Sequence, residues 1–233
     1  LTPLWVGFHE GQFYTYDGLT PASSDPRPGS VAMERICEDG DTAALTSDFA
    51  LLSKGVDATV PGPSGPIAPG DITGESFLLD PASPDQRYFS YASMIIPSND
   101  FCISNGSPLA HPVFDGAGKF VAEDFIVAGS EVLDAGTEVD DEVPANTAFF
   151  GQAAPDTGVD EGGLIGTLGS DLPAVGFAPK GSGGILDDFR FRMADFLKPG
   201  YPVLKVGFAV APAIVDDLDF VGRLRGRGYG FAS

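Results

Sequence analysis

In residues 88–96, YFSYASMII, nearly every side chain can be buried. A strand covered on both faces gives such a continuous run, whereas a half-exposed strand alternates between apolar and polar residues. We therefore expect a central strand over residues 87–96. The 31 glycines and 20 prolines are spread throughout, which is typical of short strands joined by tight turns. The chain is predicted to be an all-β antiparallel sandwich with further strands over residues 4–8, 123–133, 147–151, 185–193 and 201–210.

One region departs from this pattern and predicts a short helical insert. Ser30 can cap a helix that runs through Cys37 and is closed by Gly40. Asp41 can cap a second helix, with apolar side chains on one side at Leu45, Phe49 and Leu52. We expect the insert to pack across one end or face of the sandwich. The proline- and glycine-rich residues 58–73 and 176–184 are expected to form loops.

The length and the net charge of the chain limit the classes of protein to which it can belong. The 233 residues fit one domain, predicted over 1–221, followed by a tail over 222–233 that is basic through three arginines. The formal net charge of −20 disfavours a nucleic-acid partner and anionic membranes. No run approaches the ~20 apolar residues of a membrane span. The tail is interpreted as a solvated segment or as an arm that docks on an acidic neighbour.

The first residue and the two cysteines leave the processing and the redox state of the chain open. The chain opens at Leu1 and not at Met, as a secreted protein without its signal peptide would, and as a trimmed chain would. Cys37 and Cys102 are too few for a disulfide framework or a four-thiolate zinc site. From counting alone, they form either one bridge or two buried thiols.

Motifs of catalysis are missing from the sequence. His9 and His111 are too far apart for a helical two-histidine metal site, and no serine has glycine at both −2 and +2. Residues 116–120, GAGKF, lack a phosphate-loop pattern and resemble a hairpin turn. The loop that starts at Asp39 has alanine at the sixth and twelfth positions, where an EF-hand needs glycine and glutamate. We therefore expect no enzyme and no catalytic residues.

Two segments point to a metal site. Residues 90–101, SYASMIIPSNDF, and 133–142, LDAGTEVDDE, each end a strand-like run with carboxylates at a turn marked by Pro97 or Gly136. If the fold brings the two turns together, their oxygens form a cage of hard ligands without a nearby base or thiolate. Such a ligand set is typical of Ca²⁺.

These residues resemble a known family. MIIPSNDF (94–101) and DAGTE (134–138) are similar to the two signature segments of the spondin N-terminal domain, which occurs in F-spondin, mindin and secreted bacterial proteins. WVGFHEGQF (5–13) and MERICEDG (33–40) add to the resemblance, and VDDE (139–142) leans toward the bacterial branch. The resemblance covers residues 3–150, and its most specific feature is the ordered pair of signatures.

The resemblance implies a C2-like β-sandwich with a calcium ion near one end. Carried over by position, the metal ligands are Asp100, Asp134 and Glu138; the family often has aspartate at the last position. Asp140, Asp141 and Glu142, which follow, could contribute to the site, but a solvated acidic loop is the favoured interpretation. Because the bacterial members usually lack both cysteines, their joint presence favours a Cys37–Cys102 disulfide and an oxidising compartment.

Together these observations predict a secreted, extracellular, calcium-stabilised β-sandwich that serves adhesion or extracellular ligand binding. The expected partner is extracellular matrix, a surface glycan or a cell-surface protein. Two alternatives stay open at this point. One is a self-assembling, homo-oligomeric structural subunit of an extracellular layer or filament, and the other is a carbohydrate-active enzyme in which paired acids act as general acid and base.

Overall fold

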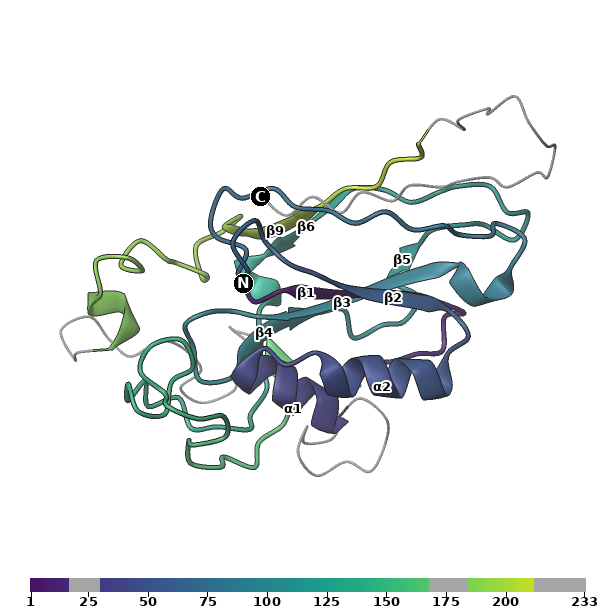
Figure 1. Ribbon diagram of the computed structural model, residues 1–233. Helices are drawn as coiled ribbons and strands as arrows, with labels where there is room; N and C mark the ends of the chain where they lie inside the picture. The colour runs from purple at the N-terminus through teal and green to yellow at the C-terminus, as the bar shows by residue number, and fades with distance from the viewer. Residues whose placement is uncertain (17–29, 168–183, 212–233) are drawn as a thin grey trace.

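A computed structural model describes residues 1–16, 30–167 and 184–211 (Figure 1). The main sheet has the order β2-β1-β3-β4-β7-β8, with β5 also paired to β3, and a second sheet pairs β6 with β9; all pairs are antiparallel. The strands are β1 (Leu4–His9), β2 (Val56–Val60), β3 (Tyr88–Met94), β4 (Phe101–Ser104), β5 (His111–Pro112), β6 (Phe125–Ala128), β7 (Leu133–Asp134), β8 (Gly166–Thr167) and β9 (Pro202–Val206). The fold of the described residues is mostly antiparallel sheet, which agrees with the all-β prediction.

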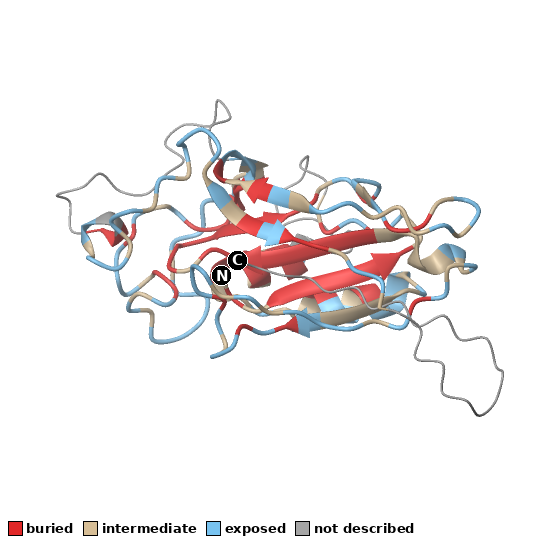
Figure 2. Ribbon diagram, turned by 90° about the horizontal axis from the view of Figure 1, so that it is seen from above, coloured by how far each residue is buried: buried red, intermediate tan, exposed pale blue. Residues whose placement is uncertain are grey.

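Strand β3 lies at the centre of the main sheet, as predicted. It pairs with β1 on one side and with β4 and β5 on the other. Six of its seven residues are buried, and all six residues of β1 are buried (Figure 2). The two faces of the sheet are covered by different layers, so the continuous apolar run of β3 has partners on both sides.

Side chains alternate between two apolar cores. Leu4, Val6 and Phe8 of β1 face one core, which also contains Val127 of β6 and Leu204 of β9. The other core contains one β1 side chain, Trp5, together with residues of β3, β4 and the helices. The β6–β9 sheet and the helices therefore lie on opposite faces of the main sheet (Figure 1).

The helical insert lies where it was predicted, with ends that differ from the expected ones by one or two residues. Helix α1 (Ser30–Asp39) ends where Gly40, at φ 69°, donates its N–H to Ile36 O at 2.9 Å. Helix α2 (Ala43–Leu52) begins where Asp41 Oδ1 accepts the Ala43 N–H at 2.8 Å. The predicted apolar side of α2 is correct for two members and wrong for the third: Leu45 and Phe49 are buried, whereas Leu52 is 48% exposed.

Short 3₁₀ turns complete the described structure: η1 (Pro84–Gln86), η2 (Gly129–Glu131) and η3 (Ile185–Asp187). Turn η2 divides the strand expected over 123–133 into β6 and β7. A Cβ on Gly129 would lie 2.0 Å from Phe196 O, so the backbones approach closely at the break. No helix in the described ranges is long and apolar enough to cross a membrane.

Two predicted strands are wrong, and both are replaced by turns. In 147–151, Thr147 O accepts the N–H groups of Phe150 and Gly151, and Phe149 adopts φ 60°. In 185–193, η3 is followed by a turn in which Asp188 Oδ1 accepts the Arg190 N–H at 2.8 Å. Aspartate side chains commonly compete with sheet hydrogen bonds in this way.

Other differences concern boundaries. The loop expected over 58–73 begins inside β2, and β4 was not among the predicted strands. The hairpin turn at 116–120 is confirmed, because Asp115 N–H donates to Lys119 O at 3.0 Å and Phe114 bridges Phe120. Apart from Gly184, the loop predicted over 176–184 lies outside the described residues, and so does the whole basic tail over 222–233.

Candidate metal centre

The antiparallel register of β4 and β7 brings the two signature segments together. Phe101 pairs with Asp134, and the N–H of Ala135 donates to Asp100 O at 3.3 Å. Asp100 is 0% exposed and Asp134 is 4% exposed. Two carboxylates that are 34 residues apart in sequence thus lie side by side, buried from solvent, one just before β4 and the other at the end of β7.

The two oxygens of Asp100 have different environments. Oδ2 accepts three hydrogen bonds: from Thr137 N at 2.8 Å, from Thr137 Oγ1 at 3.1 Å and from Glu138 N at 3.1 Å. The other oxygen, Oδ1, is buried without a hydrogen-bond partner. Such an orphaned oxygen is costly in a protein interior, where nearly all polar groups are paired. The carboxylate is therefore oriented by one oxygen and leaves the other available.

A tight turn orients Asp134. Its Oδ1 accepts the Gly136 N–H at 2.7 Å. Gly136 has φ 64°, and a Cβ there would lie 2.9 Å from backbone atoms of Gly163 and Leu164. Both the backbone conformation and the lack of space require glycine at this position.

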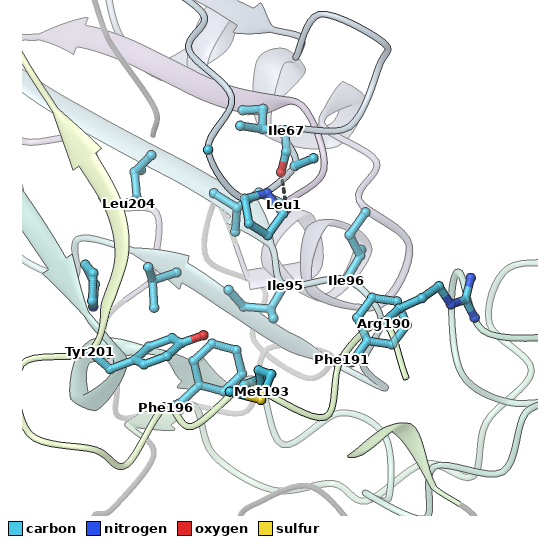
Figure 3. A pocket seen from close by; sticks show the side chains of 16 residues that line it. Leu1, Ile67, Ile95, Ile96, Arg190, Phe191, Met193, Phe196, Tyr201 and Leu204 are labelled. Carbon is cyan, nitrogen blue, oxygen red and sulfur yellow. Dashed lines mark hydrogen bonds between the residues drawn. The ribbon is translucent and has the colours of Figure 1, made fainter. Parts of the chain in front are cut away.

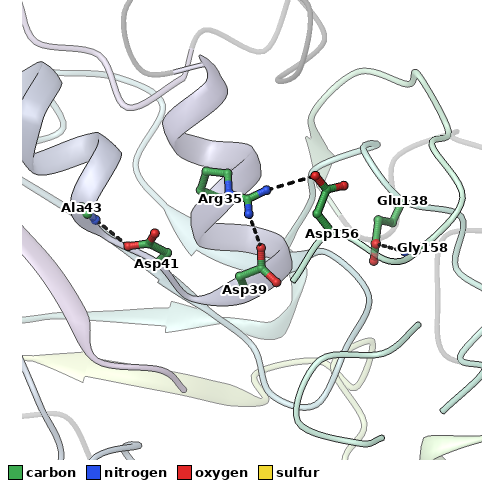
Figure 4. Close-up of polar contacts among 7 residues, drawn as sticks. All are labelled: Arg35, Asp39, Asp41, Ala43, Glu138, Asp156 and Gly158. Carbon is green, nitrogen blue, oxygen red and sulfur yellow. Dashed lines mark hydrogen bonds and ion pairs between the residues drawn. The ribbon is translucent and has the colours of Figure 1, made fainter. Parts of the chain in front are cut away.

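Glu138 is buried, at 3% exposed, but points toward a different neighbour. Its Oε1 accepts the Gly158 N–H at 2.7 Å, and its Oε2 has no hydrogen-bond partner (Figure 4). Asp156 lies beside it and pairs with Arg35 at 3.5 Å, while Arg35 also pairs with Asp39 at 3.0 Å. Glu138 is thus held by the 156–158 loop near helix α1, and Asp100 and Asp134 are held by the sheet.

Burial disfavours the ionised form of the three predicted ligands. Burial, reinforced by the charge of Asp134, raises the pKa of Asp100 to about 7. Burial likewise raises the pKa of Asp134 to about 6 and that of Glu138 to about 7. A positive charge brought among these side chains would have the opposite effect and would favour their ionised forms.

The acidic loop that follows contains residues that the sequence interpretation misplaced. Asp140 is half-buried, and burial together with the charges of Asp100 and Asp134 raises its pKa to about 9. Glu142 is 4% exposed and its Oε2 accepts the Ile185 N–H at 2.6 Å, so it is not a solvated residue. Of the three, Asp141 is exposed as expected. Because residues 138–142 are mostly acidic, the sequence alone does not show which of their carboxylates are buried.

As the side chains stand, no group of three or more histidine, cysteine, aspartate or glutamate residues in the described ranges is arranged to hold a metal ion. Asp100 and Asp134 are neighbours, and Glu138 is turned to Gly158. The assignment of all three as ligands of one ion therefore stays a prediction. Both cysteines are linked by a disulfide between Cys37 of α1 and Cys102 of β4, with an S–S distance of 2.10 Å. The predicted bridge is confirmed, and these cysteines offer no thiolate.

A buried Ser–His pair lies elsewhere in the main sheet and was not predicted from the sequence. His9 Nε2 and Ser90 Oγ are 2.9 Å apart, and the N–H of Gly11 donates to His9 Nδ1 at 3.0 Å. Because Nδ1 accepts, the ring proton is on Nε2 and points to the serine. Burial lowers the pKa of His9 to about 4, and its side chain is 0% exposed. A catalytic base needs the reverse arrangement, so this pair is structural.

An apolar pocket of about 660 Å³ lies beside the first signature segment (Figure 3). Ile95 and Ile96 form part of one wall, and Phe191 and Phe196 line the other side. Arg190 also lines the pocket, but its guanidinium donates to both carboxylate oxygens of Asp188, at 2.9 and 2.8 Å. The pocket offers apolar surface and an already paired cation.

No protein-family model, curated protein or solved structure matches the chain. The resemblance to the spondin N-terminal domain therefore stays a prediction based on the two signature segments. The geometry adds one independent observation, because the register of β4 and β7 places the acidic residues of both segments next to each other.

Proposed function

We propose that this chain is a secreted, C2-like β-sandwich of the spondin type that binds calcium where β4 and β7 meet and serves adhesion or extracellular ligand binding. The observation that supports the calcium site best is Asp100. This residue is 0% exposed, has one oxygen held by three donors and another without a partner, and lies beside Asp134.

The donor set fits a hard divalent cation. Calcium takes ~6–8 oxygen ligands at ~2.3–2.6 Å, commonly from carboxylates, backbone carbonyls and water. Asp100 Oδ1 and Glu138 Oε2 lack hydrogen bonds, and Asp134 lies next to Asp100. These three residues would hold the ion. Its charge would offset the repulsion between buried carboxylates and would link the 133–142 segment to the sheet, which adds to folding stability.

Calcium binding can be measured by titration calorimetry and by thermal melts in calcium and in chelator. We expect the wild-type melting temperature to rise with calcium; at 100 times Kd the stabilisation is ~2.7 kcal/mol. Asp100→Asn and Asp134→Asn should abolish this rise, since each amide oxygen can keep the existing hydrogen bonds while one charge is lost. Glu123→Gln, at an exposed position, is the control. A wild-type chain that binds no calcium at millimolar concentration would disprove the site.

The disulfide and the net charge of the chain suggest the class of partner. The disulfide is typical of an oxidising compartment, and the net charge of −20 favours a partner that presents cations or neutral polar groups. We therefore propose extracellular matrix protein, surface glycan or a cell-surface protein. Binding of the wild-type chain and of Asp134→Asn to immobilised matrix proteins and glycans, each with calcium and with chelator, tests this. Binding unaffected by both changes would separate the adhesion role from the ion.

A further inference from the structure

Helix α1 places a fourth carboxylate beside the candidate centre. Glu38 is 3% exposed, and its Oε2 has no hydrogen-bond partner. Burial is the largest contribution that raises its pKa to about 8, and the charges of Glu138, Glu34 and Asp100 add to it. An isolated glutamate on a short surface helix would be expected in solvent, where ionisation costs nothing. Here the helix turns the carboxyl group toward the signature segments instead.

A shared hydroxyl links this glutamate to the sheet. The hydroxyl of Thr137 donates to Asp100 Oδ2 at 3.1 Å and also lies close enough to the Glu38 carboxyl group to lower the pKa of that group. A threonine hydroxyl has one proton, so it cannot donate to two carboxylates at once. If Glu38 and Asp100 are both ionised, one of them loses its donor at Thr137.

The disulfide holds these residues in register. Cys37 directly precedes Glu38, and Cys102 lies two residues after Asp100. Their Cα atoms are 5.0 Å apart. The bridge therefore fixes the end of α1 against the start of β4, which is the spacing that decides whether Glu38 reaches the candidate centre.

We propose that Glu38 takes part in divalent cation binding, so that helix α1 contributes a carboxylate to the centre formed by Asp100, Asp134 and Glu138. This inference rests on the proposed calcium site and extends it to the helical insert. Three buried oxygens without partners, one each on Glu38, Asp100 and Glu138, carry it. The role of α1 is then to complete the centre in addition to covering the sheet.

The test is calcium titration calorimetry of Glu38→Gln, with melts of each variant in chelator. We expect the glutamine variant to bind calcium about 10-fold to 100-fold more weakly, as for other residues that support a metal. Its melting temperature in chelator should equal or exceed that of the wild type, because a buried carboxyl group that must hold a proton to stay neutral is replaced by a neutral amide. Glu38→Asp, which keeps the charge, should bind more tightly than Glu38→Gln. The control Glu34→Gln, one turn earlier on α1, should stay within about twofold of the wild type.

The outcomes separate the two proposals. A wild-type chain that binds no calcium overturns the proposed function and this inference with it. A wild-type chain that binds calcium, together with a weakened Asp100→Asn and an unchanged Glu38→Gln, overturns only the role of Glu38. Equal weakening by Glu34→Gln and Glu38→Gln also overturns it, since the effect would then follow from the net charge of the helix.

Discussion

Removal of the Cys37–Cys102 bridge should strongly destabilise the fold. The bridge joins residues that are 65 apart in sequence. The chain-entropy relation for a closed loop of this length gives ~4 kcal/mol of stabilisation at 25 °C. Both cysteines are 0% exposed, so alanine is a better replacement than serine, whose hydroxyl would be buried without a partner. We expect Cys37→Ala/Cys102→Ala to lose about 4 kcal/mol of unfolding free energy.

Urea unfolding at fixed calcium concentration measures the loss. The fluorescence of Trp5, the single tryptophan, reports the relevant core, because its ring packs edge-on against Phe49 of α2 at 5.4 Å. The double variant should also show a larger m-value, since its unfolded chain is less compact. Reducing agent should destabilise the wild type by a similar amount and leave the variant unchanged. A loss below ~1 kcal/mol, or a wild type insensitive to reduction, would refute the reasoning.

Two further predictions concern the candidate centre. In chelator, the free energy of unfolding should be greatest near pH 4 and should fall as the pH rises through 6 to 7. The folded state raises the pKa of Asp134 to about 6 and that of Asp100 to about 7. It therefore holds protons that the unfolded chain has already released. Thermal melts between pH 4 and 8 check this, and a stability that rises over that range would contradict it. Gly136→Ala should cost ~1 kcal/mol for its φ of 64° and more for its backbone contacts at 2.9 Å. Gly162→Ala, at φ 68° with open space around it, should cost only the ~1 kcal/mol that comes from the positive φ, measured in the same urea assay.

The sequence predicted best those elements whose local pattern agrees with their tertiary surroundings. The continuous apolar run of β3 matched a strand with a layer on each face, and the glycine at 40 matched a positive-φ helix end. The strand expected over 185–193 would place Phe189, Phe191 and Met193 on one face. Phe189 is 76% exposed and Met193 is 82% exposed, so there was no core for that face to contact. The short-range hydrogen bonds of Asp188 then decided the conformation.

The candidate centre shows a different limit of prediction from the sequence, which concerns the direction of side chains. Signature residues identify which carboxylates share a turn, and the β4–β7 register brought Asp100 and Asp134 together as that interpretation required. The direction of a side chain depends on contacts that are distant in sequence. Glu138 turns to the N–H of Gly158, and Glu38 follows Cys37, which a disulfide joins to β4. With 33 acidic residues in the chain, a buried carboxylate has no signature of its own in the sequence.

The burial of these carboxylates gives the strongest argument for an ion. Asp100, Glu38 and Glu138 each have one oxygen without a hydrogen-bond partner, and the guanidinium of Arg35 is engaged by Asp39 and Asp156 at the outer side. Protons can neutralise such a group at low pH, but each proton held at neutral pH requires a raised pKa and so opposes folding as the pH increases. A divalent cation neutralises two charges at once and needs the oxygens that are left free. If the centre binds a divalent cation as proposed, the covalent bridge would set the spacing of these carboxylates and the cation would supply the positive charge that they need.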